Sequence, residues 1–200
     1  MLSPGEDLHA DLDGGWLLPE PAPREALCTR SIACRSFRRD DGMLDVDGRF
    51  IDTRAFAHHS FSRGDCEAGA PLHTMQLRLT LDRKRLIQAL VSAMPRTPYA
   101  GCAEVNPNFQ RLVGLSITRG FRQAMRERIG GTEGCTHVIA LLDAMAAAAI
   151  QAFASESNVP PLPGQPVPVR VWSVDALVGT CHSYHPDGPV IAQLKTRFGG

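Results

Sequence analysis

Residues 136–153 form an almost uncharged segment of about five helical turns, in which Asp143 is the single charged side chain. Helical spacing gathers its large apolar residues on one stripe, while alanines occupy the other face. Such a stripe is stable only against another apolar surface, so the rest of the chain must supply one. The stripe consists of Val138, Leu141, Leu142, Met145, Ala149 and Phe153.

The first half of the chain supplies that surface as strands. Residues 28–56 alternate in polarity and are cut by Asp-Gly turns, which predicts an antiparallel meander. Residues 75–82 alternate with a period of two. Residues 85–94 fit either period, and we interpret them as a strand paired with 75–82 rather than as a short helix. Short helices are predicted at 107–113 and 116–129, before the long one.

This order predicts an α+β fold. We expect an antiparallel sheet of three to five strands in the N-terminal half, covered on one face by the helices of the C-terminal half. Residues 1–25, rich in Pro, Gly and acidic residues, are expected to be a flexible arm. Residues 26–200 are expected to be a single α+β domain with a Pro-rich connector at 158–168 and a C-terminal tail.

The bulk composition excludes some partners. The 21 basic residues balance the 21 acidic ones, so no net field attracts nucleic acid. The N-terminus lacks the basic start and apolar stretch of an export signal. No run is expected to reach the roughly 18 apolar residues of a membrane span. We therefore predict a cytoplasmic protein that binds neither nucleic acid nor membrane.

In a reducing compartment, the six cysteines are expected to be free thiols or metal ligands rather than disulfides. Cys28 and Cys34 fall in a predicted strand, where core packing is the default. Cys135 begins the long helix, and the positive end of a helix dipole favours the thiolate form. A buried, inert Cys135 with a surface His137 is the ordinary alternative.

Four potential metal ligands are expected to converge. His73 lies just before the clearest strand, and Cys102 just after the strand that would pair with it. Adjacent antiparallel strands bring the start of one beside the end of the next. The long helix, packed on this sheet, would add Cys135 and His137. A Cys2His2 set suits zinc, and the same ligand types also hold iron or an iron–sulfur cluster.

Further Cys and His residues extend this set. Cys181 and His182 form a second pair that can supply an additional ligand, against the alternative of a buried cysteine and an exposed histidine. Cys66, with His58 and His59, lies in a polar loop that can approach the site.

Arginines mark the first strand and the helix at 116–129, and most are expected to be solvated. Arg30 or Arg119 could hold a small anion.

Residues 69–102, "GAPLHTMQLRLTLDRKRLIQALVSAMPRTPYAGC", resemble the core of NifU/IscU-type iron–sulfur scaffold proteins. "CTHVIALLDAMAAAAI" is similar to the motif that begins their long helix, with Cys and His in reversed order. The resemblance implies a NifU/IscU-like fold and a metal site. The scaffolds carry three cysteines and an aspartate, whereas this chain has "LHTM" near the first of them, which favours zinc or iron binding over cluster assembly.

Residues 28–155, with the tail "CHSYHPDGPV", more closely resemble an uncharacterised bacterial family. Its marks are an Arg-x-Ile start, an Asp-Gly meander, a His before the strand and a Gly-Cys-Thr-His motif. This resemblance implies no activity.

Three functions follow as hypotheses. The first is a metal-binding carrier or accessory protein, with zinc preferred over iron or an iron–sulfur cluster and with a client or donor protein in metal or sulfur delivery. The second is a small-molecule metalloenzyme of hydrolase or lyase type, with Asp52, Asp65 or Glu133 as base. The third is a metal-free interaction domain. Common enzyme motifs are absent, and the oligomeric state stays open.

Overall fold

The computed structural model describes residues 19, 22–156, 159–161 and 173–198. Most of the expected arm at 1–25 and of the connector at 158–168 lies outside the described residues. Those two predictions therefore stay predictions, and the architecture below concerns the described part of the chain.

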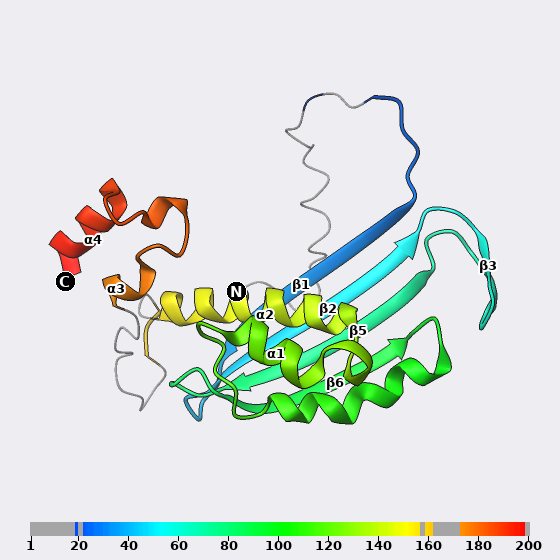
Figure 1. Cartoon of the computed structure of the whole chain (residues 1–200), viewed down its shortest axis with the longest axis horizontal. Helices are drawn as coiled ribbons and strands as arrows, with labels where there is room; N and C mark the ends of the chain where they lie inside the picture. Colours follow the sequence, from blue (N-terminus) through cyan, green and yellow to red (C-terminus); the bar gives the residue numbers. More distant parts are fainter. Residues whose placement is uncertain (1–18, 20–21, 157–158, 162–172, 199–200) are drawn as a thin grey trace.

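Four long strands form one antiparallel sheet in the order β1-β2-β5-β6 (Figure 1). They are β1 (Cys28–Arg38), β2 (Leu44–Arg54), β5 (Pro71–Leu81) and β6 (Ile87–Arg96). A separate hairpin, β3 (His58–Ser60) and β4 (Gly64–Cys66), lies in the chain between β2 and β5. Sequence-adjacent pairing of the long strands confirms the antiparallel sheet predicted for the N-terminal half.

Helices make up the second half of the described chain, and those between Ala100 and Ser155 lie over one face of the sheet (Figure 1). The α-helices are α1 (Phe121–Ile129), α2 (Thr136–Ser155), α3 (Val174–Leu177) and α4 (Pro189–Phe198). The 3-10 helices are η2 (Ala100–Leu112), η3 (Gly131–Glu133) and η5 (His182–Tyr184). The predicted α+β class is confirmed.

The two sequence periods that predicted this fold meet in one core. Met75, Leu77, Leu79 and Leu81 of β5 are all buried, as the alternation of that strand requires. The stripe of α2 is buried with them in the same apolar cluster. Helix and sheet approach closely at Gly48 of β2, where an added Cβ would overlap the side chain of Met145. Glycine is therefore required there for packing.

By length and composition alone, α2 is able to span a membrane, since a window of it reaches a mean hydropathy of 1.8 with 39% of the window buried. The sequence expectation that no segment reaches this level is wrong by that measure. The core helix of a soluble protein passes the same test, and the apolar stripe of α2 packs on the sheet.

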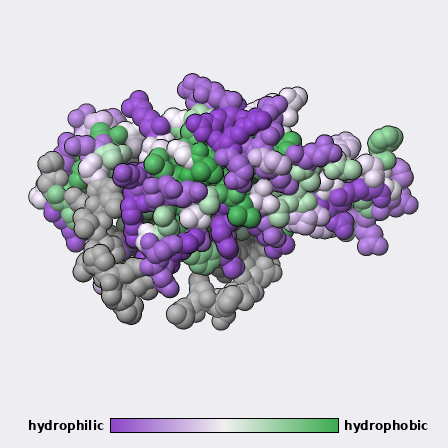
Figure 2. Space-filling view, turned by 90° about the horizontal axis from the view of Figure 1, so that it is seen from below, coloured by the Kyte–Doolittle hydropathy of each residue, from purple (hydrophilic) through white to green (hydrophobic). Residues whose placement is uncertain are grey.

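Three local expectations differ from the structure. Residues 58–66 were expected to be a polar loop but form the β3–β4 hairpin, which continues the sheet end as a narrow, mainly hydrophilic projection at the right of Figure 2. The helix expected at 107–113 is a 3-10 helix that already begins at Ala100 and contains Pro107, whose missing N–H costs a single hydrogen bond. Cys34 packs against the core, whereas Cys28 is exposed at the end of edge strand β1.

Candidate metal centre

A row of three polar side chains crosses the helix-covered face of the sheet where β2 ends and β5 begins. Arg30 of β1 lies opposite Asp52 of β2, and Asp52 lies opposite His73 of β5. Directly opposed residues on antiparallel strands have neighbouring side chains. The register shifts immediately beyond Asp52, so the aligned pairing ends at this row.

The N-terminus of α2 brings a second histidine to this row. Cys135 is the N-cap residue, with extended backbone, and its carbonyl accepts the Ile139 N–H at 3.0 Å. The Cys135 side chain does not cap the helix; its Sγ lies 3.6 Å from Nδ1 of His137. The His137 ring packs edge-on against Phe50, with centroids 5.2 Å apart. Two residues of one helical turn thus point toward the sheet.

Contacts with η2 and with the end of α1 fix the turn before α2. A Cβ at Gly134 would collide with the carbonyl oxygen of Ile129, so this position requires glycine. Asn108 of η2 donates to the Glu133 carbonyl at 3.0 Å, and Arg111 pairs with the Glu133 carboxylate at 2.7 Å. These contacts hold the Gly-Cys-Thr-His segment over the start of β5.

Asp52, His73 and His137 form a compact cluster, in which one ligand atom of each lies within 4.8 Å of the other two. Oδ2 of Asp52 is 3.3 Å from Nδ1 of His73 and 3.6 Å from Nε2 of His137. The two imidazole rings lie 4.0 Å apart, centroid to centroid. Ligands at about 2.0–2.1 Å from a tetrahedral zinc lie about 3.3 Å from one another, so little movement would close these atoms on an ion.

Charges set the protonation states that a metal ligand needs. Burial alone would raise the pKa of Asp52, but the hydrogen bonds and charge of Arg30, helped by the two histidines, bring it below the ordinary value. Burial lowers the pKa of His73, and the neighbouring His137 lowers it further. Burial also lowers the pKa of His137. At neutral pH the cluster is therefore one carboxylate and two neutral imidazoles, the forms that bind metal.

The donor set fits a borderline divalent ion. Nδ1 of His73 is buried and has no hydrogen-bond partner, although the Asp52 carboxylate lies nearby. A buried nitrogen without a partner costs free energy, which a bound ion would recover. Two histidines and one carboxylate suit zinc or Fe(II) and leave further coordination positions open.

A scan against protein families matches residues 28–151 to the family described as "Protein of unknown function (DUF2889)". The chain belongs to this family. The comparisons with curated proteins and with solved structures find no match. The resemblance to NifU/IscU-type scaffolds therefore has no support from relatives, and the family description supplies no activity.

The matched region contains all of the residues of the cluster, of which sequence reasoning identified the two histidines as ligands. It named Asp52 only as a possible base. The signal for Asp52 was its position in a strand that pairs with the strand beginning near His73. The structure places Cys135 beside His137 but outside the group of three. Cys102 lies in the first turn of η2 and is also outside that group.

The remaining candidates lie elsewhere. The described tail, from α3 to α4, lies beyond the C-terminal end of α2, so Cys181 and His182 are at the opposite end of the helix from the cluster (Figure 1). Of the possible bases, Asp65 pairs with His59 at 2.9 Å and Glu133 pairs with Arg111. Arg30, expected to hold an anion, pairs with Asp52 instead.

Proposed function

We propose that the protein binds a divalent metal ion, zinc or iron, through Asp52, His73 and His137, and that it acts on a small molecule at that ion. One observation carries the proposal: a carboxylate and two imidazoles from two strands and a helix place their ligand atoms within 4.8 Å of one another. Oppositely charged groups meet often on protein surfaces, whereas here two largely buried imidazoles converge on one carboxylate.

The number of ligands favours an enzyme over a carrier. Closed sites with four protein ligands are structural, while sites with three leave a position for water or substrate. The side chains of Asp52, His73 and His137 are 14%, 11% and 22% exposed, so the cluster is sheltered but reachable. An ion held there would supply a Lewis acid that polarises a carbonyl or activates water.

The protein residues have separate roles in this proposal. Asp52 and the two histidines bind, and Arg30 orients Asp52 through two hydrogen bonds. Cys135 faces Nδ1 of His137, so we assign it the orientation of that ring rather than direct coordination. With no thiolate among the three ligands, the site is a poor match for an iron–sulfur scaffold. Delivery to a client protein and a cytoplasmic location stay predictions.

One contact favours a second candidate function. Sγ of Cys135 lies 3.6 Å from Nδ1 of His137, and Nε2 of the same ring lies 3.6 Å from Oδ2 of Asp52. Cys135 is at the N-terminus of a long helix. A thiol beside an imidazole that a carboxylate orients is the arrangement of a cysteine nucleophile. In that case the chemistry would require Cys135 and no metal.

Titration with cobalt(II) distinguishes the proposed metal site from the cysteine nucleophile. Apo protein is titrated with Co²⁺, and visible and near-ultraviolet absorption is recorded for wild type, Asp52→Asn, His73→Ala and His137→Ala. We expect one Co²⁺ per chain in the wild type and loss of high-affinity binding in each variant. Thiolate-to-cobalt charge transfer should be absent, because the ligands are nitrogen and oxygen.

Cys102→Ser serves as the matched control, since Cys102 is a cysteine outside the group of three. Its cobalt spectrum should equal that of the wild type. A thiolate-to-cobalt charge-transfer band that is present in the wild type and lost in Cys102→Ser or Cys135→Ser would instead support the Cys2His2 site predicted from the sequence. Absence of metal binding, together with rapid alkylation of Cys135 by iodoacetamide, would favour the thiol nucleophile instead.

A further inference from the structure

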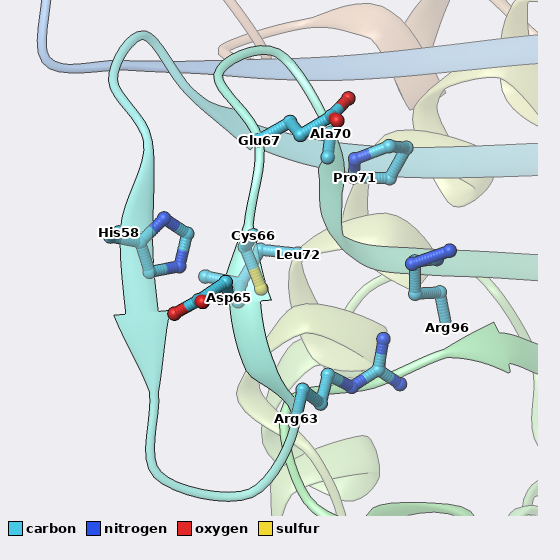
Figure 3. Close-up of a pocket in the computed structure, with 9 residues that line it drawn as sticks. All are labelled: His58, Arg63, Asp65, Cys66, Glu67, Ala70, Pro71, Leu72 and Arg96. Carbon is cyan, nitrogen blue, oxygen red and sulfur yellow. The ribbon is translucent and has the colours of Figure 1, made fainter.

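A pocket opens where the β3–β4 hairpin meets the start of β5 and the end of β6 (Figure 3). Its volume is about 330 Å³, which is within the range of small-molecule sites. The hairpin contributes His58, Arg63 and Cys66, and β6 contributes Arg96. One wall is residues 70–72, directly before His73 of the metal centre, yet none of the three metal ligands lines the pocket.

The two guanidinium groups of this pocket are not used by the fold. Neither Arg63 nor Arg96 forms an ion pair with any residue that the structure describes. Figure 3 shows both guanidinium groups on the same side of the pocket, with the Asp65 carboxylate pointing to the opposite side and the Glu67 carboxylate at the upper rim beside Ala70. Asp65 is engaged by His59 at 2.9 Å. Two positive groups thus face one space without a protein anion between them.

The hairpin is fastened in the position that creates this space. The hydroxyl of Ser62, next to Arg63, donates to the carbonyl of Pro98, two residues after Arg96. This contact ties the tip of the hairpin to the chain that leaves β6. Arg63 and Arg96 come from segments more than thirty residues apart, and the Ser62 contact keeps them on one pocket.

His58 adds a polar group that has no partner. Both of its ring nitrogens are buried and make no hydrogen bond within the described residues. His58 lies directly opposite Cys66 in the hairpin ladder, and the thiol of Cys66 points to the carbonyl of Gly64 instead. A buried imidazole without a partner carries an energetic cost that a ligand in the pocket would remove.

We propose that this pocket binds a small molecule through a carboxylate or phosphate group, held by Arg63 and Arg96 with His58 as a further hydrogen-bond donor. Guanidinium groups bind such oxyanions through paired, charge-assisted hydrogen bonds. The pocket is separate from the metal centre, so it binds its anion whether or not a metal is present.

Calorimetric titration of metal-free protein with inorganic phosphate and with succinate tests the proposal and distinguishes the two oxyanion classes. We expect at least one of them to bind, and its affinity to fall about tenfold in Arg63→Ala and in Arg96→Ala. The anion that binds more tightly identifies the class. When the same titration is followed by NMR, the ring resonances of His58 should shift, which locates the ligand in this pocket.

Two variants serve as controls. Arg126→Ala removes an exposed arginine of α1 and should leave anion affinity unchanged. Asp52→Asn removes a proposed metal ligand and should also leave it unchanged, which separates this proposal from the metal site. The proposal is overturned if neither anion binds the wild type, or if binding persists undiminished in Arg63→Ala and Arg96→Ala.

Discussion

Arg30 and Asp52 face each other across β1 and β2, with Nε 2.8 Å from Oδ1 and Nη2 2.9 Å from Oδ2. The guanidinium fork fixes the plane of the carboxylate whose Oδ2 also faces both imidazoles. Replacement of Arg30 by Gln removes this orientation. We expect zinc affinity to fall about 10- to 100-fold, as for outer-shell partners of other metal sites. Competition with a chromophoric chelator measures it.

Arg35→Gln is the matched control for this prediction, because Arg35 is an exposed arginine of the same strand. Equal zinc affinities in Arg30→Gln and wild type would show that Asp52 needs no clamp, and would remove Arg30 from the proposed site.

His137 has Nδ1 directed at Cys135 and Nε2 directed at Asp52. If the metal takes Nε2, the proton of the neutral ring must lie on Nδ1. We predict that zinc fixes this tautomer, which nitrogen-15 shifts of the labelled ring will report. Zinc coordination through Nδ1 would contradict the role assigned to Cys135.

Much of the fold could be predicted because two different periods mark its two layers. The period-two alternation of residues 75–81 and the stripe of α2 each determine one buried face, and these faces can only pack on each other. The β3–β4 hairpin could not be predicted, since its strands are three residues long and too short to show a period.

The candidate site was predicted in part, for a related reason. Strand order brings the start of β5 near the end of β6, but it does not determine where the chain beyond β6 goes. Cys102 enters η2 there, outside the cluster. The position of Asp52 opposite His73 depends on the register between β2 and β5. The sequence does not specify this register, because a hairpin separates the two strands.

The two histidines predict a pH dependence of stability in metal-free protein. Burial lowers the pKa of both in the folded state, so between the folded and unfolded values the unfolded chain binds more protons. The stability that depends on their neutral form is present above about pH 6.5, the unfolded value, and is lost as pH falls through the folded values. Urea unfolding between pH 8 and pH 5 measures this loss.

The double variant His73→Gln, His137→Gln should show a flatter pH profile over that range, since glutamine does not titrate. If its stability falls with pH as steeply as that of the wild type, other groups carry the effect and the two imidazoles are not buried in neutral form.

Gly48 and Met145 test the packing that supports the site. A Cβ at Gly48 would overlap Met145, with Leu141 beside it at 3.0 Å, so Gly48→Ala must displace these buried side chains or move α2 away from β2. We expect a loss of about 1–3 kcal/mol in the free energy of unfolding, typical of an overpacked core.

Gly101→Ala is the control, because a Cβ there meets its nearest atom, in Glu104, at 3.7 Å. The double variant Gly48→Ala, Met145→Ala should lose less than the sum of its single variants, because removing the Met145 side chain makes room for the added Cβ, which in turn fills part of the space left behind. Strict additivity would mean that the helix does not rest on this glycine, and that His137 is held over Asp52 by other contacts.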